Sequence, residues 1–306
     1  MLYDIIIIGA GPSGMSAAIA AQRVGRSTLI IDKFGYGGNI VNARAVENYP
    51  GIETISGVDF SKRLFAQATG FGSSYKSAEV TGITLDRYEK VVETTRGDFR
   101  GKSVIIATGS THKNLGIGEE AFLGRGVSFS AVYDGGNFKR KVVAVVGGGD
   151  TATSDAEFLA DICDKVYVIV RRDRFKNDSV ASKHLDALEN VEVMFNSEVI
   201  GIHGKTTVTG IAVKDNVTEE TQDIDVYGVF VSIGQVPKNQ PFMSVAPVDV
   251  EGYFTAGEDC ESGTPGVFVA GDCRSKRLRQ LSTAMSDGTV AAIEASTYLS
   301  RIDQRA

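Results

Sequence analysis

The sequence contains few cysteines, and their spacing excludes several kinds of site. Only three occur among 306 residues, Cys163, Cys260 and Cys273, and no two are spaced as in a CxxC motif or a zinc site. We therefore expect no disulfide framework and assign no metal ligands. Cys163 and Cys260 are expected to be small buried apolar residues, whereas a redox role for Cys273 stays open.

An excess of basic residues and a long apolar run are also lacking. The formal net charge is −6, and a nucleic-acid-binding protein normally carries clustered positive charge, so we expect no nucleic-acid partner. The apolar run from Ile5 to Ile8 is too short to span a bilayer and has no basic leader before it. We therefore expect no membrane association and a cytoplasmic location.

Glycine, in contrast, is abundant with 35 residues, and the first cluster has a nucleotide-binding pattern. A buried strand predicted over Tyr3–Ile8 leads into Gly9-Ala10-Gly11-Pro12-Ser13-Gly14 and an alanine-rich helix over 15–24. In such a pattern the first glycine makes a tight turn, the second lets the backbone approach a pyrophosphate and the third lets helix and strand pack closely.

A second strand, predicted over 28–31, ends at Asp32, where a carboxylate can accept hydrogen bonds from ribose hydroxyls. A glycine-rich turn without a ligand is the alternative. The combination of strand, helix, second strand and terminal acid favours a dinucleotide site.

The same pattern recurs in mid-chain. A predicted strand over 142–146 precedes Gly147-Gly148-Gly149-Asp150-Thr151-Ala152 and a helix over about 152–160. The next predicted strand, 166–170, ends in Arg171-Arg172 instead of an acid. Two guanidiniums can bind a 2′-phosphate, so this second site is predicted to prefer NADPH over NADH. The alternative is a solvated pair of surface arginines.

Two dinucleotide folds in one chain imply two cofactors, and the usual reason to hold both is hydride transfer between a nicotinamide and a flavin. The fold that ends in an acid suits FAD, and the fold that ends in arginines suits NADPH.

Further motifs extend over essentially the whole chain. They are Gly37-Gly38-Asn39, Glu47-Asn48-Tyr49-Pro50-Gly51, Ala107-Thr108-Gly109-Ser110, the GGGDTA loop, Arg171-Arg172-Asp173, the segment 266–272 with sequence GVFVAGD, and Arg279-Gln280. With these motifs the sequence resembles the low-molecular-weight thioredoxin reductases.

The resemblance implies an α/β fold with two Rossmann-like dinucleotide-binding domains of the three-layer ββα type. The FAD-binding domain would comprise residues 1–112 and 241–306, and the NADPH-binding domain, 113–240, would be inserted through two short β-type linkers. Asp272 would hydrogen-bond the flavin ribityl chain, and Arg279-Gln280, at a helix start, would lie near the flavin pyrimidine edge. A homodimer is also implied.

The candidate residues form two sets. For FAD they are Gly9, Gly11, Pro12, Ser13, Gly14, Asp32, Gly38, Asn39, Asn48, Thr108, Gly109, Gly271, Asp272, Arg279 and Gln280. For NADPH they are Gly147, Gly149, Asp150, Thr151, Ala152, Arg171 and Arg172.

The chain departs from this family just before the second glycine loop. There the reductases carry a redox-active CxxC followed by Asp-Gly, whereas this sequence reads Ser130-Ala131-Val132-Tyr133-Asp134-Gly135. Ser130 and Tyr133 replace the two cysteines and cannot form a disulfide. Asp134 either relays protons near the flavin or serves as a turn residue before Gly135. Tyr133 either forms a lid against the flavin ring or packs inside the NADPH domain.

We therefore expect an NADPH:acceptor oxidoreductase in which the flavin passes electrons directly to an external acceptor. A ferredoxin or flavodoxin, a quinone, an external disulfide and oxygen all stay open as acceptors. One alternative is a ferredoxin/flavodoxin–NADP reductase, although residues 300–306 leave little room for the C-terminal extension of that family. Another is a redox-silent regulatory flavoprotein.

Overall fold

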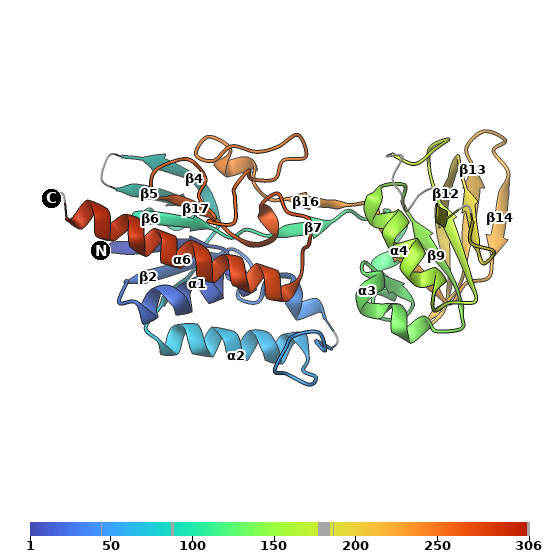
Figure 1. The fold of residues 1–306 in the computed structure, drawn as a ribbon, viewed down its shortest axis with the longest axis horizontal. Coiled ribbons are helices and arrows are strands. Elements are labelled where there is room, and N and C mark those ends of the chain that lie inside the picture. Colours follow the sequence, from blue (N-terminus) through green and yellow to red (C-terminus); the bar gives the residue numbers. More distant parts are fainter. Residues whose placement is uncertain (44, 87–88, 177–183, 186, 305–306) are drawn as a thin grey trace. The chain divides into compact units, whose positions relative to one another are not determined.

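The computed structural model describes residues 1–304 except 44, 87–88, 177–183 and 186. The chain divides into two compact units (Figure 1). The first unit comprises Met1–Thr111 and Val236–Ala306, and the second unit comprises His112–Gln235. Each is described by itself.

The first unit is built on a seven-stranded sheet with the order β3-β2-β1-β6-β5-β4, to which β17 adds beside β6. The parallel strands are β1 (Leu2–Ile8), β2 (Thr28–Asp32), β3 (Ser74–Ser77), β6 (Phe99–Ile106) and β17 (Val267–Val269). The antiparallel strands are β4 (Val80–Leu85) and β5 (Lys90–Thr94). The three helices are α1 (Pro12–Arg23), α2 (Gly57–Gly70) and α6 (Leu281–Asp303).

Side chains of β1 point alternately to two separate cores. Ile5 and Ile7 pack with residues of α1, α2 and α6, whereas Ile6 and Ile8 pack on the opposite face of the sheet with Phe254. Both faces of the strand are thus covered, which is why its sequence is apolar without alternation. In Figure 1, α6 runs along α1, so the C-terminal end of the chain completes the N-terminal fold.

The second unit has a parallel five-stranded sheet with the order β11-β10-β9-β15-β8. Its strands are β8 (Val127–Ser128), β9 (Val142–Val146), β10 (Lys165–Ile169), β11 (Val191–Met194) and β15 (Gly228–Val231). An antiparallel sheet of β12 (Ser197–Gly204), β13 (Val208–Asp215) and β14 (Thr221–Ile224) forms another layer. Its helices include α3 (Ala131–Asp134) and α4 (Asp150–Ala160).

The two faces of β9 again pack into different cores. Val143 and Val145 face the core that contains residues of α4, whereas Ala144 and Val146 face the core formed with the antiparallel sheet. The predicted mixed α/β class with two Rossmann-like parallel sheets is confirmed.

Two short strands, β7 (Ser110–His112) and β16 (Gln235–Pro237), pair where the chain passes between the units. The compact units divide after Thr111 and after Gln235. The predicted domain limits, after residues 112 and 240, stay a proposal. Asn239 is buried, and its amide donates to the carbonyls of Gly252 (2.9 Å) and Cys273 (2.7 Å) in the first unit. Among the described residues, no helix is long and apolar enough to cross a membrane.

Candidate functional site

The first glycine loop joins β1 to α1 with little space around its backbone. Gly9 has φ +109°, and a Cβ there would lie 2.2 Å from the carbonyl oxygen of Ala107. A Cβ on Gly14 would lie 1.9 Å from the carbonyl oxygen of Gly9. Gly11 is the N-cap of α1 and Pro12 follows it in the first turn, so no side chain caps the first N–H groups of the helix. These groups are available to an anion.

The Gly37-Gly38-Asn39 motif lies against this loop. The N–H of Gly37 donates to the carbonyl of Ala10 at 2.7 Å. Gly38 has φ +60°, and a Cβ there would lie 3.1 Å from the Cα of Gly11. The side chain of Asn39 donates to the carbonyl of Ser110 at 2.6 Å. Three of the sequence motifs therefore converge at one place.

Asp32 ends β2 with its carboxylate fixed by the backbone. Its Oδ2 accepts from the N–H of Ala10 and its Oδ1 from the N–H of Phe34, both at 2.8 Å. Each carboxylate oxygen can accept a second hydrogen bond. The position therefore fits the expected role toward a ribose.

Two buried oxygens beside the loop have no hydrogen-bond partner within the described residues. They are Ser13 Oγ and Asp272 Oδ1. A Cβ on Gly271 would lie 2.8 Å from the Cβ of Ser13, so the C-terminal GD motif abuts the N-terminal loop. Burial raises the pKa of Asp272, which the charges of Lys276 and Arg279 oppose. Unsatisfied buried oxygens are costly, and hydroxyl groups of a ligand such as the FAD ribityl chain would satisfy them.

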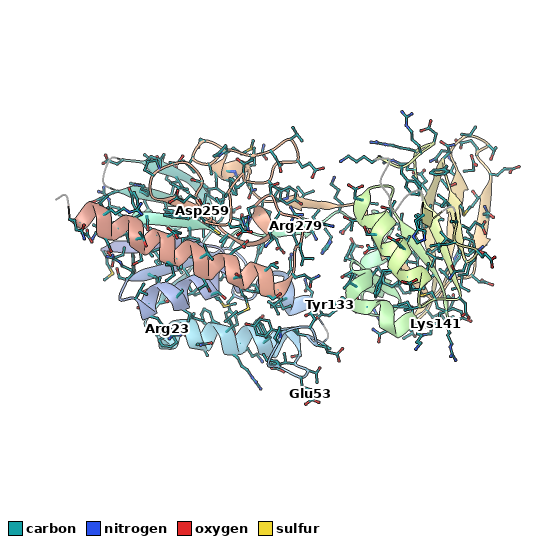
Figure 2. The ribbon with its side chains drawn as sticks, viewed as in Figure 1. Arg23, Glu53, Tyr133, Lys141, Asp259 and Arg279 are labelled. Atoms are coloured by element: carbon teal, nitrogen blue, oxygen red, sulfur yellow. The ribbon has the colours of Figure 1, made fainter. Side chains whose placement is uncertain are left out.

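The start of α6 brings the remaining candidates together. Asn48 donates to Gln280 Oε1 at 3.1 Å, and Gln280 is the N-cap of α6. The guanidinium carbon of Arg279 lies 3.9 Å from the ring centroid of Tyr253; Arg279 is labelled in Figure 2. Thr108 donates to Asn239 at 3.2 Å, and Gly109 has φ +68°. These FAD candidates, distant in sequence, therefore lie in one unit.

The second glycine loop joins β9 to α4 in the second unit. Gly147 has φ +150°, and a Cβ there would lie 2.4 Å from the carbonyl oxygen of Ser232. Gly149 is the N-cap of α4, and a Cβ there would meet nothing within 4 Å. Asp150 and Thr151 are exposed in the first turn, whereas Ala152 is buried. The loop thus has an open backbone at a helix start, as a phosphate site needs.

Arg171 and Arg172 follow β10 and are both exposed. Neither forms an ion pair with a carboxylate of the described residues. Two exposed guanidiniums at this strand end are what the prediction for NADPH requires.

The segment from Ser130 to Asp134 begins and ends in hydrogen bonds to one residue, Ser128. Ser128 Oγ donates to Asp134 Oδ2 at 2.6 Å and accepts from the N–H of Ser130 at 3.0 Å. Asp134 ends α3, and Tyr133 on the same turn is partly buried (Figure 2). Within the described residues, the Asp134 contacts are those of a turn residue.

All three cysteines are free and buried. Burial raises the pKa of Cys163 to about 11 and that of Cys260 to about 12, and it also raises the pKa of Cys273. Since the thiolate is the reactive form, none of these environments activates a thiol near neutral pH.

Sequence reasoning missed a charged group next to Asp272, formed by Arg274, Lys276 and Asp287. The only local signal was the density of basic residues between 274 and 279. Their partner Asp287 lies on α6 and could not be assigned from spacing.

Comparison with known proteins agrees with this arrangement. The family described as pyridine nucleotide-disulphide oxidoreductase matches residues 3–288. Thioredoxin reductase of Bacillus subtilis (strain 168) is 37% identical over 305 residues, covering 99% of this chain and 96% of the relative. The corresponding protein of Listeria monocytogenes is 38% identical over 305 residues, with the same coverage. The crystal structure of thioredoxin reductase from Streptococcus pyogenes has a TM-score of 0.92 at 34% identity, covering 98% of this chain and 99% of the other.

Members of this family use FAD and NADPH. The loops, the buried oxygens and the fixed carboxylate described above fit these two cofactors. The chain therefore belongs to the pyridine nucleotide-disulphide oxidoreductase family, in its low-molecular-weight thioredoxin reductase class, and is an FAD-dependent NAD(P)H oxidoreductase.

Proposed function

We propose that this protein is an NADPH:acceptor oxidoreductase that transfers electrons through FAD to an external acceptor without an internal redox disulfide. The observation that carries the proposal is the pair Ser130 and Tyr133 where the reductases have cysteines. The three cysteines that do occur are buried and lie elsewhere in the chain. A hydroxyl and a phenol cannot replace a dithiol in thiol–disulfide exchange.

Bound FAD would supply the two-electron chemistry that no side chain provides. In the first unit, Asp32 would hold the adenosine ribose, and Asp272 and Ser13 would accept from or donate to the ribityl chain. The first-turn N–H groups of α1 would hold the pyrophosphate. The start of α6, with Gln280 and Arg279, would lie near the pyrimidine edge and favour negative charge there.

In the second unit, the loop at Gly147 and Gly149 would hold the NADPH pyrophosphate, with Asp150, Thr151 and Ala152 forming the helix start. Arg171 and Arg172 would bind the 2′-phosphate. The hydrogen bond from Ser128 to Asp134 supports a structural role for that carboxylate, since it fixes the turn that carries Ser130 and Tyr133.

The test uses the purified yellow protein under anaerobic conditions. We expect NADPH to bleach the flavin absorbance, and the reduced protein to pass electrons to a dye or quinone. With NADPH and thioredoxin we expect no disulfide reduction above background. The matched variant carries Ser130→Cys together with Tyr133→Cys, and we expect it to form the missing dithiol and to gain thioredoxin reduction.

Each alternative gives a distinct result. Thioredoxin reduction by the unmodified protein at the rate of the double variant would overturn the proposal, and Cys273→Ser would then test the first candidate thiol. Turnover restricted to ferredoxin or flavodoxin would indicate a ferredoxin/flavodoxin–NADP reductase. Bleaching without turnover of any acceptor would indicate a regulatory flavoprotein.

A further inference from the structure

Three charged side chains next to Asp272 form a cluster that the nucleotide motifs do not include. Arg274, Lys276 and Asp287 compose it, and we call it the charge cluster. Arg274 contacts Asp287 at two points, from Nε to Oδ2 at 2.8 Å and from Nη2 to Oδ1 at 2.9 Å. Lys276 Nζ donates to Asp287 Oδ2 at 3.0 Å. The side chains of Lys276 and Asp287 are only 8% and 9% exposed, so these contacts are shielded from solvent.

Asp287 also holds the backbone of the turn that carries Asp272. The N–H of Gly271 donates to Asp287 Oδ2 at 3.0 Å. The residue after Asp287 is Gly288, where a Cβ would lie 2.0 Å from the carbonyl oxygen of Ser13. Asp287 therefore fixes the Gly271–Asp272 turn at the point where α6 touches the first glycine loop.

Lys276 lies between two carboxylates. Its Nζ is 3.0 Å from Asp287 Oδ2 and 3.7 Å from Asp272 Oδ1. Asp287 accepts four hydrogen bonds, whereas Asp272 Oδ1 has none within the described residues, and the Asp272 side chain is 29% exposed. Asp272 is thus the member of this group that can still accept a hydrogen bond from a ligand.

The charge state of Asp272 depends on several neighbours. Burial raises its pKa, as does the charge of Asp287, while Lys276 and then Arg279 lower it. The phenol of Tyr253 also lies within electrostatic range of Asp272. Of the two opposing cations, Lys276 has the larger effect and the direct ion pair.

We propose that Asp287 and Lys276 are positioning residues for the flavin: Asp287 fixes the turn at Gly271, and Lys276 keeps Asp272 ionised as an acceptor for a ribityl hydroxyl. This inference rests on the proposed placement of FAD in the first unit. Neither residue is required to contact the flavin ring, and both act through Asp272.

The test measures FAD binding to the apo-protein from pH 5 to pH 8. We expect Lys276→Met to weaken FAD binding by about tenfold at pH 7, because the charge-assisted hydrogen bond from a ribityl hydroxyl to Asp272 is weakened. We also expect the pH below which FAD binding declines to move upward, because loss of the nearby Lys276 cation raises the pKa of Asp272. Lys276→Arg, which keeps the charge, should restore the pH profile.

Arg277→Met is the matched control, since it removes an exposed cation at the next position of the same loop. It should leave the FAD affinity and its pH profile unchanged. Asp272→Asn should abolish the pH dependence, and adding Lys276→Met to it should move nothing further. For Asp287→Asn, the unfolding temperature of the apo-protein shows whether the fold survives. If it does, FAD affinity should fall even at pH 8, because a neutral amide holds Arg274, Lys276 and the N–H of Gly271 less firmly than the carboxylate does. Loss of the Asp287 charge by itself would only lower the pKa of Asp272, so it cannot account for that fall.

An equal loss of affinity at all pH values in Lys276→Met, or a profile like that of Arg277→Met, would overturn the role of Lys276. An unchanged FAD affinity in folded Asp287→Asn would overturn the role of Asp287. Both results concern FAD binding and not the electron acceptor. The acceptor assays can therefore contradict the proposed function while the predicted FAD-binding profiles are still observed.

Discussion

Arg171 and Arg172 offer the sharpest test of nucleotide choice at the level of single residues. Replacing both by alanine should weaken NADPH binding far more than NADH binding, since each charge-assisted phosphate contact contributes about 1.5–3 kcal/mol. The measurement is the ratio of kcat/KM for the two nucleotides in flavin-linked reduction of a dye. Arg174→Ala, at another exposed arginine two residues later, should leave the ratio unchanged. An unmodified protein that prefers NADH would contradict the assignment.

How well single residues could be predicted depended on how local their role is. Gly9, Gly14 and Asp32 lie in one continuous strand–loop–helix–strand pattern, and each has a geometry that its position in the pattern requires. Lys276 lies in a loop and Asp287 on α6, and the two side chains come into contact only in the folded protein. No spacing rule connects them, so sequence reasoning stopped at Asp272.

Among the elements, α4 is joined to the end of β15 by a buried hydrogen bond between a serine and a titratable carboxyl group. Ser232, just after β15, donates to Asp155 on α4 at 2.6 Å, and both residues are buried. Burial raises the pKa of Asp155 from 3.8 to about 6, with the hydrogen bond from Ser232 acting in the opposite direction. A carboxyl group whose pKa is higher in the folded than in the unfolded protein stabilises the fold when it is protonated. The contribution of Asp155 to the free energy of unfolding therefore declines as pH rises from about 4 to about 6.

We therefore compare the free energy of unfolding of the protein with that of Asp155→Asn at pH 4 and pH 7. The free energy of unfolding of the unmodified protein, minus that of the variant, should decrease by up to about 3 kcal/mol between these pH values. This is the equivalent of about two pKa units. Denaturant unfolding measures both values. Asp161→Asn, at an exposed carboxylate just after α4, should not reproduce this dependence. A constant difference would show that Asp155 does not titrate in this range.

The type of each motif-bearing element followed from sequence, whereas its limits and partners did not. We expected the first helix to begin at Met15, but α1 begins at Pro12, since the preset φ of proline suits the first helical turn after Gly11. The GVFVAGD motif, named in the sequence analysis, contains the buried strand β17. Its pairing with β6 depends on the fold of the whole first unit.

At the scale of the whole molecule, the proposed function has the second unit hold the nicotinamide and the first unit hold the flavin. The sequence analysis left two alternatives for Tyr133, a lid against the flavin ring and packing inside the second unit, and the lid alternative makes a kinetic prediction. Aromatic contact would contribute about 0.5–1.5 kcal/mol, which must be lost before the nicotinamide can approach.

The expected result is that Tyr133→Ala speeds flavin reduction by NADPH by roughly twofold to tenfold, the rate equivalent of that contact energy. Stopped-flow absorbance at saturating NADPH measures it. Val132→Ala alters a neighbouring side chain that is 64% exposed and serves as the control. Equal rates in all three proteins, with Tyr133 packed inside the second unit, would remove the lid from the mechanism.

The discontinuous first unit has a consequence for the order in which the chain can fold during its synthesis. The second unit is contiguous, and its ends meet where the N–H of Lys113 donates to the carbonyl of Gly234 at 3.0 Å. It can therefore complete its core as soon as residue 235 has left the ribosome. The first unit starts earlier but must wait for β17 and α6, which follow the second unit in the chain, to cover β6 and α1. The unit that is begun first is thus completed after the unit inserted into it, and its N-terminal glycine loop stays uncovered until α6 has been made.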